Sequence, residues 1–126
     1  MSIAIWCVLI AGILPILVAG YAKRLGGYYD NSKPRDVAQH YEGSAKRAHA
    51  AHLNSYEAFP LFAAAVLLAE MKGAPRGAVD ILAIVFIGLR VGYVWTYVSD
   101  KPTLRSIAWA LALFSTIAIF ISPLWR

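Results

Sequence analysis

Apolar residues occur along the chain in four long blocks, and most charged residues lie in the gaps between them. The blocks cover residues 3–22, 48–71, 78–98 and 104–124. A helix rises about 1.5 Å per residue, so a block of roughly 20 residues crosses a hydrocarbon layer about 30 Å thick. The first block has no charged residue, whereas the second contains Glu57 and the third contains Asp80 and Arg90. The pattern predicts four transmembrane helices.

The composition also favours a membrane protein. Of the 126 residues, 60% are hydrophobic and 15% are charged, and the mean hydropathy is +0.58. An average soluble domain has roughly 25% charged residues, and a disordered chain has more. Four spans of roughly 20 residues leave no room for a separate soluble domain. We therefore expect one all-α integral membrane domain over residues 1–126, folded as a four-transmembrane-helix bundle.

The connection at residues 23–47 is the longest polar segment of the chain. Gly26, Gly27, Asn31 and Pro34 are of residue types that favour turns, so they predict turns here rather than a helix. The length of this loop would allow it to cover a site that opens on the same side of the membrane.

Basic residues are distributed unequally between the two sides of the predicted membrane domain. The first and third connections hold eight Lys and Arg residues, and the second connection and the C-terminus hold three: Lys23, Arg24, Lys33, Arg35, Lys46, Arg47, Lys101 and Arg105 against Lys72, Arg76 and Arg126. Cytoplasmic loops carry the excess of Lys and Arg, which places residues 23–47 in the cytoplasm and both termini on the non-cytoplasmic side. Because these residues flank the membrane rather than share one exposed face, no nucleic-acid partner is expected.

Two ionisable residues, Glu57 and Arg90, lie well inside the predicted spans, where an unpaired charge costs several kcal/mol. Glu57 is about ten residues from the cytoplasmic start of its span and Arg90 about eight from the cytoplasmic end of its own, which gives depths of roughly 15 and 12 Å. The two side chains therefore lie at nearly the same level, and we expect them to pair.

Further polar residues share the faces of these two. At about 100° per residue, Asn54 lies close to Glu57 on the second span, and Tyr93 and Tyr97 follow Arg90 on the third. Two polar stripes thus face the cytoplasmic half of the membrane. Either they form a binding site or they only hold the helices together.

The third span also carries Gly88 and Gly92, a pair that permits close helix packing on the side away from Arg90. Neither side of this helix suits contact with lipid, and four helices can hardly bury both. We therefore expect an oligomer with the polar stripes at a subunit interface.

Arg105 opens the fourth span, where Pro102 suits the first turn of a helix. A guanidinium near the positive end of a helix dipole favours an anion. The alternative is that Arg105 only reaches the lipid headgroups.

No metal site is expected. His49 and His52 lie three residues apart on one predicted helix, but no third ligand with suitable spacing accompanies them. The single cysteine, Cys7, allows no disulfide within the chain and no thiolate ligand set.

The pattern Asn54-x-x-Glu57-x-x-Pro60-x-Phe62, followed by Arg90, Tyr93, Tyr97 and Arg105, resembles the MAPEG family, the membrane-associated proteins in eicosanoid and glutathione metabolism. The resemblance covers nearly the whole chain, including the order of four spans and the long first loop. Residues 31–62 resemble the short bacterial members. The resemblance implies an integral protein of a bacterial inner membrane.

Resemblance to this family implies a MAPEG-like homotrimer with active sites between neighbouring subunits near the cytoplasmic face. Its implied partners are a second and third copy of the chain, membrane lipids and a small hydrophobic substrate. Its implied co-substrate is glutathione, whose sulfur attacks that substrate. The expected activity is that of a glutathione-dependent transferase or peroxidase, acting on lipophilic electrophiles or lipid hydroperoxides.

The resemblance also implies roles for individual residues. Arg105 corresponds to the catalytic arginine that stabilises the glutathione thiolate. The residues implied to bind glutathione are Arg24 and Arg47 at its carboxylates, Asn54, Glu57 and Arg90 in its cradle, and Tyr93 and Tyr97 at its thiol end.

The chain departs from the family's well-studied enzymes at Ala50 and Leu53, where those enzymes usually carry basic residues. Two expected contacts to carboxylates are therefore missing, although Lys46, Arg47 or His52 is available to replace them. The alternative function is a noncatalytic lipid-binding or scaffold protein of the same fold. A small transporter is a third reading, but the chain lacks the inverted repeat and broken helices typical of transporters.

Overall fold

A computed structural model describes residues 1–27 and 31–125, and its regular secondary structure there is entirely helical. Arg126, which entered the charge count, lies outside this part of the chain. The elements are α1 (Ile3–Gly26), α2 (Pro34–Gln39), α3 (Gly43–Met71), α4 (Arg76–Val98), α5 (Pro102–Ile121) and the 3₁₀ turn η1 (Ser122–Trp125). Within the described residues, three segments are long and apolar enough to span a membrane: α1, α4 and Pro102–Trp125. The protein is therefore an integral membrane protein.

The helix α3 contains the second predicted span, residues 48–71, but it is not among these three segments. Its first half is polar and includes Asn54 and Glu57, and Glu70 lies near its end. Because ionisable groups lower the mean hydropathy of a helix, α3 needs neighbours to cover its polar residues if it crosses the hydrocarbon layer.

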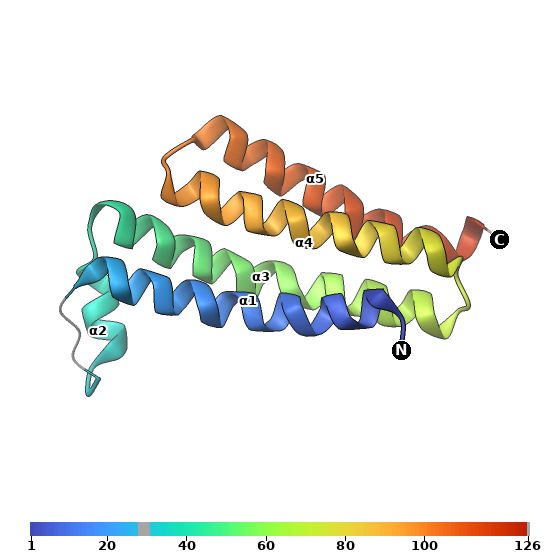
Figure 1. Ribbon diagram of the computed structural model, residues 1–126, viewed down its shortest axis with the longest axis horizontal. Coiled ribbons are helices and arrows are strands. Elements are labelled where there is room, and N and C mark those ends of the chain that lie inside the picture. Colours follow the sequence, from blue (N-terminus) through green and yellow to red (C-terminus); the bar gives the residue numbers. More distant parts are fainter. Residues whose placement is uncertain (28–30, 126) are drawn as a thin grey trace.

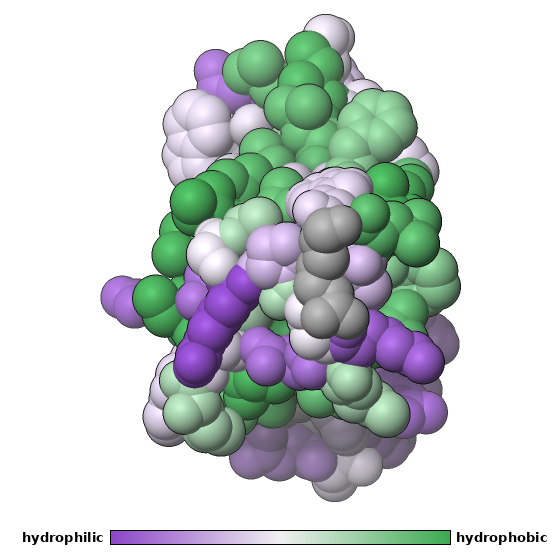
Figure 2. Space-filling view, turned by 90° about the vertical axis from the view of Figure 1, so that its right-hand side faces the viewer, coloured by the Kyte–Doolittle hydropathy of each residue, from purple (hydrophilic) through white to green (hydrophobic). Residues whose placement is uncertain are grey.

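The four long helices lie side by side, with α1 against α3 and α4 against α5 (Figure 1). The two pairs pack against each other, because α3 also contacts α4 and α5, and α1 contacts α4. Both termini and the α3–α4 connection are at one end, which we call the terminal end. The helix α2 and the α4–α5 connection are at the other, the loop end. Figure 2 shows the terminal end, where hydrophilic side chains gather over the middle and lower part.

Small side chains form many of the contacts between neighbouring helices. Ala4, Ala65 and Ala83 are fully buried, and the rings of Phe62 and Phe86 stack at 3.9 Å between α3 and α4. Small residues allow helix backbones to approach closely, which is how membrane helices gain packing energy. Large apolar side chains point outward instead, in a pattern that suits contact with acyl chains.

The start of α1 is fixed by two acidic residues from other helices. The backbone amide of Ala4 donates to Asp80 Oδ1 of α4 at 2.9 Å, and Ser2 Oγ donates to Glu70 Oε1 of α3. The first amides of a helix have no partner within the helix and lie at its positive end, so a carboxylate there is favourable. Asp80, which sequence analysis left without a role, therefore ties α4 to α1.

The prediction of turns rather than helix in residues 23–47 was wrong in part: α1 continues to Gly26, Pro34–Gln39 forms the six-residue helix α2, and α3 begins at Gly43. Proline suits the first turn of a helix, and Asp36 complements the dipole there. The imidazole of His40 donates from Nδ1 to the carbonyl of Asp36 at 2.7 Å. A helix this short shows too little periodicity to be found in a sequence. Gly27 does end α1, with φ at +77°.

Candidate active site

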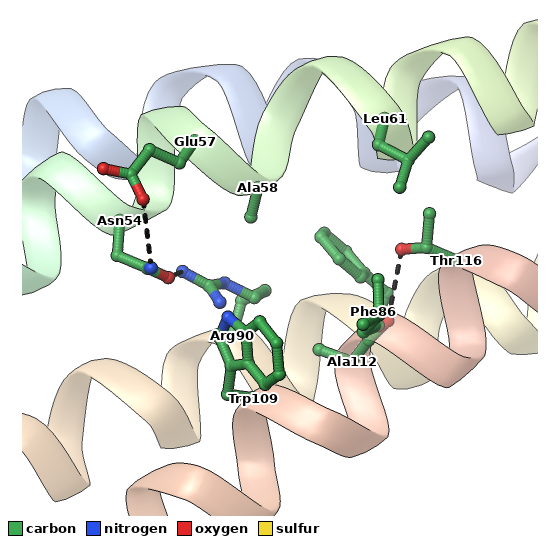
Figure 3. A pocket seen from close by; sticks show the side chains of 10 residues that line it. Asn54, Glu57, Ala58, Leu61, Phe86, Arg90, Trp109, Ala112 and Thr116 are labelled. Atoms are coloured by element: carbon green, nitrogen blue, oxygen red, sulfur yellow. Dashed lines mark hydrogen bonds between the residues drawn. The ribbon is translucent and has the colours of Figure 1, made fainter.

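A cavity of about 220 Å³ lies between α3, α4 and α5, and we call it the central cavity (Figure 3). One end is polar and is formed by Asn54, Glu57 and Arg90. The other end is apolar, and its lining residues are Ala58, Leu61, Phe86, Ala112 and Leu113, with Thr116 beside them. A cavity that is charged at one end and apolar at the other suits the meeting of a polar and an apolar reactant.

The polar end is a chain of three side chains. Arg90 Nη2 donates to Asn54 Oδ1 at 2.8 Å, and Asn54 Nδ2 donates to Glu57 Oε2 at 3.4 Å. Arg90 is 2% exposed, whereas Glu57 is exposed to the surroundings. The sequence predicted a direct pair between Glu57 and Arg90, and this was wrong, because the Asn54 amide lies between them. The amide satisfies the buried guanidinium and leaves the carboxylate at the mouth of the cavity.

A row of two arginine and two tyrosine side chains leads from the central cavity to the start of α5. The Arg90 guanidinium lies 4.3 Å from the centroid of the Tyr93 ring, and the Arg105 guanidinium lies 4.5 Å from that of Tyr97. The two tyrosine rings meet edge to face at 5.7 Å. Positions 90, 93 and 97 share one face of α4, because residues three and four apart superpose on a helix. These cation–π contacts join α5 to the polar end of the cavity.

Arg105 lies in the first turn of α5, which starts at Pro102. The N-cap residue, Lys101, makes no capping hydrogen bond with its side chain. Amides at this helix start therefore keep their partial positive charge, and the Arg105 guanidinium adds a full one. The half-buried Arg105 side chain thus faces a region that favours an anion.

The two remaining predicted residues lie away from the central cavity. Arg47 Nε donates to the carbonyl of Val98 at 3.1 Å, where it satisfies the last turn of α4. The Arg24 side chain is exposed in the last turn of α1 and makes no hydrogen bond or ion pair with any residue that the structure describes. The fold thus gathers Asn54, Glu57, Arg90, Tyr93, Tyr97 and Arg105, and it leaves Arg24 and Arg47, the two arginines predicted to bind carboxylates, apart from them.

Most of the α5 residues that line the central cavity were not predicted from the sequence. Trp109 lies opposite Arg90, and Thr116 lines the far end, where its hydroxyl donates to the Ala112 carbonyl (Figure 3). Residues 105, 109, 112 and 116 follow one another at helical spacing, so they share a stripe of α5. That spacing from Arg105 is the signal in the sequence that would have identified them.

Comparison with known protein families gives one result. The family model described as the MAPEG family matches residues 3–125, which is nearly the whole chain. The chain matches no curated protein.

Proposed function

Because the chain belongs to the MAPEG family, which includes glutathione transferases and peroxidases, we propose that it is a membrane-bound enzyme of this kind. The proposed substrates are lipophilic electrophiles or lipid hydroperoxides, and the proposed co-substrate is glutathione. The observation that supports the proposal most is the connected series Glu57–Asn54–Arg90–Tyr93–Tyr97–Arg105 from three helices.

This series, together with Arg24 and Arg47 outside it, can supply the charges that glutathione needs. Glutathione carries two carboxylates, one ammonium group and a thiol. The exposed carboxylate of Glu57 can accept hydrogen bonds from the ammonium group, and the exposed guanidinium of Arg24 can bind a carboxylate. Arg47 can bind the other carboxylate only by leaving the Val98 carbonyl. Arg90 then keeps Asn54 and Glu57 in place rather than meeting solvent itself.

Arg105 has the proposed catalytic role. An unperturbed thiol has a pKa near 8.5, and a guanidinium beside a helix N-terminus lowers the pKa of a neighbouring thiol. Tyr97 holds the Arg105 guanidinium over its ring, and the Tyr93 ring meets the Tyr97 ring edge to face. In transfer, the sulfur forms a bond to the electrophilic carbon while the leaving group departs with its electron pair. In peroxide reduction, two thiols become one disulfide as the hydroperoxide becomes an alcohol and water.

The lipophilic substrate would approach from the bilayer. The apolar end of the central cavity and the exposed apolar side chains of α5, such as Phe114, offer it a mainly apolar surface. Apolar contacts of this kind tolerate many shapes, which suits a broad range of electrophiles.

Thiolate formation tests the proposal directly. Mixing the purified protein with glutathione at pH 7 in a stopped-flow instrument should produce the ultraviolet absorbance of a thiolate, together with release of a proton. S-hexylglutathione, which has no free thiol, should bind and produce no such signal. If saturating glutathione gives no thiolate absorbance, the enzymatic proposal is wrong.

A homotrimer is the proposed assembly, because the site within one chain is small. The central cavity of about 220 Å³ is below the roughly 300–1,000 Å³ of most small-molecule sites, so a neighbouring subunit is needed to complete it. On α4, an added Cβ at Gly88 or Gly92 would meet nothing within 4 Å, which leaves this stripe open for a second copy.

The protein solubilised in mild detergent should therefore have a protein mass about three times that of the 13.8 kDa chain. Gly92→Leu should dissociate the particle, since a large side chain prevents close helix approach. The matched control is Gly77→Leu, near the terminal end of the same helix, where an added Cβ also meets nothing. A fully active particle with the mass of one chain would contradict the trimer.

A noncatalytic lipid-binding or scaffold role is the second candidate. It is favoured by the engagement of Arg47 with Val98, together with Ala50 and Leu53 at positions that are usually basic in the family's enzymes. This candidate predicts that lipid is co-purified, that glutathione produces no thiolate, and that the Arg105→Ala variant behaves as the wild type. The stopped-flow measurement thus separates the two functions.

A further inference from the structure

A second and larger cavity opens at the loop end between α1, α2 and α3, and we call it the loop-end cavity. Its volume is about 670 Å³, which lies within the roughly 300–1,000 Å³ of most small-molecule sites. It shares no lining residue with the central cavity, and the proposed glutathione chemistry gives it no role. A ligand of this cavity would therefore bind separately from glutathione.

Small side chains contribute to two walls of the loop-end cavity. Ala19 and Gly20 line it from α1, and Ala38 lines it from α2. An added Cβ at Gly20 would meet nothing within 4 Å, so the space beside this glycine is open. A ligand can therefore approach the backbone of α1 closely at this point.

A row of four aromatic rings forms the wall on the side of α3, and we call it the aromatic row. Tyr41, which precedes α3, is followed by His49, His52 and Tyr56 on α3, with successive ring centroids 5.9, 5.5 and 5.0 Å apart. The three rings on α3 are three and four residues apart, so they share one face of the helix. Rings on one wall and small side chains on the others suit a flat aromatic ligand, because aromatic rings pack favourably against one another.

The proton position on the His52 ring is fixed by a hydrogen bond to α1. His52 Nδ1 lies 2.8 Å from the carbonyl oxygen of Pro15, and a carbonyl oxygen can only accept, so Nδ1 carries the proton. In the neutral imidazole the other nitrogen, Nε2, is then an acceptor. Nε2 accepts no hydrogen bond from any residue that the structure describes. The half-buried His52 side chain therefore offers an acceptor to a ligand that carries a hydroxyl group.

The protein surface next to the cavity is apolar. On α3, Leu53 and Tyr56 line the cavity and are 47% and 48% exposed. On α1, Ile16 and Leu17 lie four and three residues before Gly20, so they share its face of the helix, and both are exposed. They are farther from the loop end than Gly20. An apolar chain that leaves the cavity in this direction would therefore lie along the part of α1 that faces the hydrocarbon layer.

We propose that the loop-end cavity binds a lipophilic phenol, with its flat ring between the aromatic row and Gly20 and its apolar chain along α1 and α3. The phenolic hydroxyl donates a hydrogen bond to His52 Nε2. An aryl ether fits less well, because it has no proton to donate. A saturated ring alcohol also fits less well, because its puckered ring cannot pack on the imidazole and phenol rings as a flat one does.

The experiment uses the full chain, purified in a neutral detergent and labelled with ¹⁵N at its three histidines. Three probes with the same apolar chain are compared: 4-decylphenol, 4-decylanisole and 4-decylcyclohexanol. The anisole keeps the flat ring without a donor, and the cyclohexanol keeps the donor without a flat ring. Calorimetric titration at a fixed detergent concentration gives the affinity, and NMR follows the Nε2 resonance of His52.

One 4-decylphenol per chain should bind at least about tenfold more tightly than either other probe, since tenfold is the order of the effect of one hydrogen bond to a buried acceptor. It should also shift the Nε2 resonance of His52, and 4-decylanisole should leave that resonance in place. Saturating glutathione should change neither result. This distinguishes the loop-end cavity from the proposed active site, whatever the outcome of the thiolate measurement.

His52→Asn tests the hydrogen bond. The asparagine amide can still donate to the Pro15 carbonyl, but it has no acceptor in the place of Nε2, so the preference for 4-decylphenol over 4-decylanisole should disappear. The matched control is His40→Asn. His40 Nδ1 donates in the same way to the Asp36 carbonyl at 2.7 Å, and His40 does not line the cavity. The control should keep the preference.

Gly20→Leu tests the position of the ring, and it carries the test if His52→Asn does not fold. The leucine side chain would occupy the open space beside α1 and should weaken the binding of 4-decylphenol at least about tenfold. Gly77→Leu is the control, because an added Cβ at Gly77 also meets nothing and this residue does not line the cavity.

Several results would overturn the proposal. Equal binding of the three probes would show only partition into apolar surroundings. Equal losses in Gly20→Leu and Gly77→Leu, or in His52→Asn and His40→Asn, would place the phenol elsewhere. Displacement of 4-decylphenol by glutathione would assign the cavity to the active site.

Discussion

Arg105→Ala should lower kcat/KM for glutathione conjugation by about 100- to 1000-fold, the usual cost of removing one group that stabilises a developing anion. The thiolate absorbance at pH 7 should disappear with it. Arg105 is half-buried, and its guanidinium lies over the face of the Tyr97 ring rather than making a hydrogen bond to Tyr97. The melting temperature should therefore change little. Arg105→Lys should keep part of the activity, since it keeps the charge but not the planar stacking.

The conjugation rate should depend on pH differently in the wild type and in Arg105→Ala. In the wild type we expect the pKa of the glutathione thiol to lie below its ordinary value, so the rate should be nearly constant above neutral pH. In Arg105→Ala the thiol pKa returns toward about 8.5, so the rate should rise about tenfold per pH unit below that value. The matched control is Lys101→Ala, which removes a positive charge from the N-cap of the same helix, where Lys101 lies 5.5 Å from the Trp95 ring. A loss of activity in the control as large as that in Arg105→Ala would show that only the total charge matters.

Arg90→Met should reduce both stability and glutathione binding. The variant leaves the Asn54 carbonyl without its donor and removes the stacking on Tyr93, which should lower the free energy of unfolding by about 1–3 kcal/mol. Glutathione affinity should fall at least about tenfold, because Asn54 no longer holds Glu57 in position. Thermal unfolding in detergent and calorimetric titration measure the two effects.

A second substitution separates the two roles of Arg90. Adding Asn54→Leu to Arg90→Met removes the unsatisfied amide and should recover stability, since an apolar pair can replace a buried polar pair at little cost. It should not recover glutathione binding. Arg76→Met is the control, because Arg76 is exposed at the start of α4 and should change stability by no more than about 0.5 kcal/mol. If the double variant binds glutathione as the wild type does, the hydrogen-bonded series has no part in binding.

The helices follow closely from the sequence. The first predicted span, residues 3–22, lies within α1, and the third, residues 78–98, lies within α4. Their boundaries are marked by charged residues and by glycine and proline, because a helix leaves the membrane where polar residues become frequent. Such information is local, so it can be read from the order of residues alone. The depth of Glu57 and Arg90 in the membrane also follows from the order of residues, since depth depends only on the number of residues from the end of a span.

The contacts between helices do not follow from the sequence in this way. The sequence placed Asn54, Glu57 and Arg90 near one another, but only the fold inserted the Asn54 amide between the two charges. The same holds for Arg47, which the fold assigns to the end of α4, and for Asp80, which it assigns to the start of α1. Each of these contacts joins residues that are at least 36 positions apart, except the pair on α3.

The sequence determines the helices but not the contacts between them, because helices follow from periodicity and their contacts depend on packing. The sequence by itself determined which residues form helices, which faces are polar and how deep each polar group lies, because backbone hydrogen bonding fixes the rise and rotation of every helix. Only the tertiary structure decided which polar groups meet, because the axial rotation and separation of neighbouring helices depend on how small and large side chains fit together. A cavity of about 670 Å³ that is lined by residues of α1, α3 and the unforeseen α2 is therefore visible only in the folded chain.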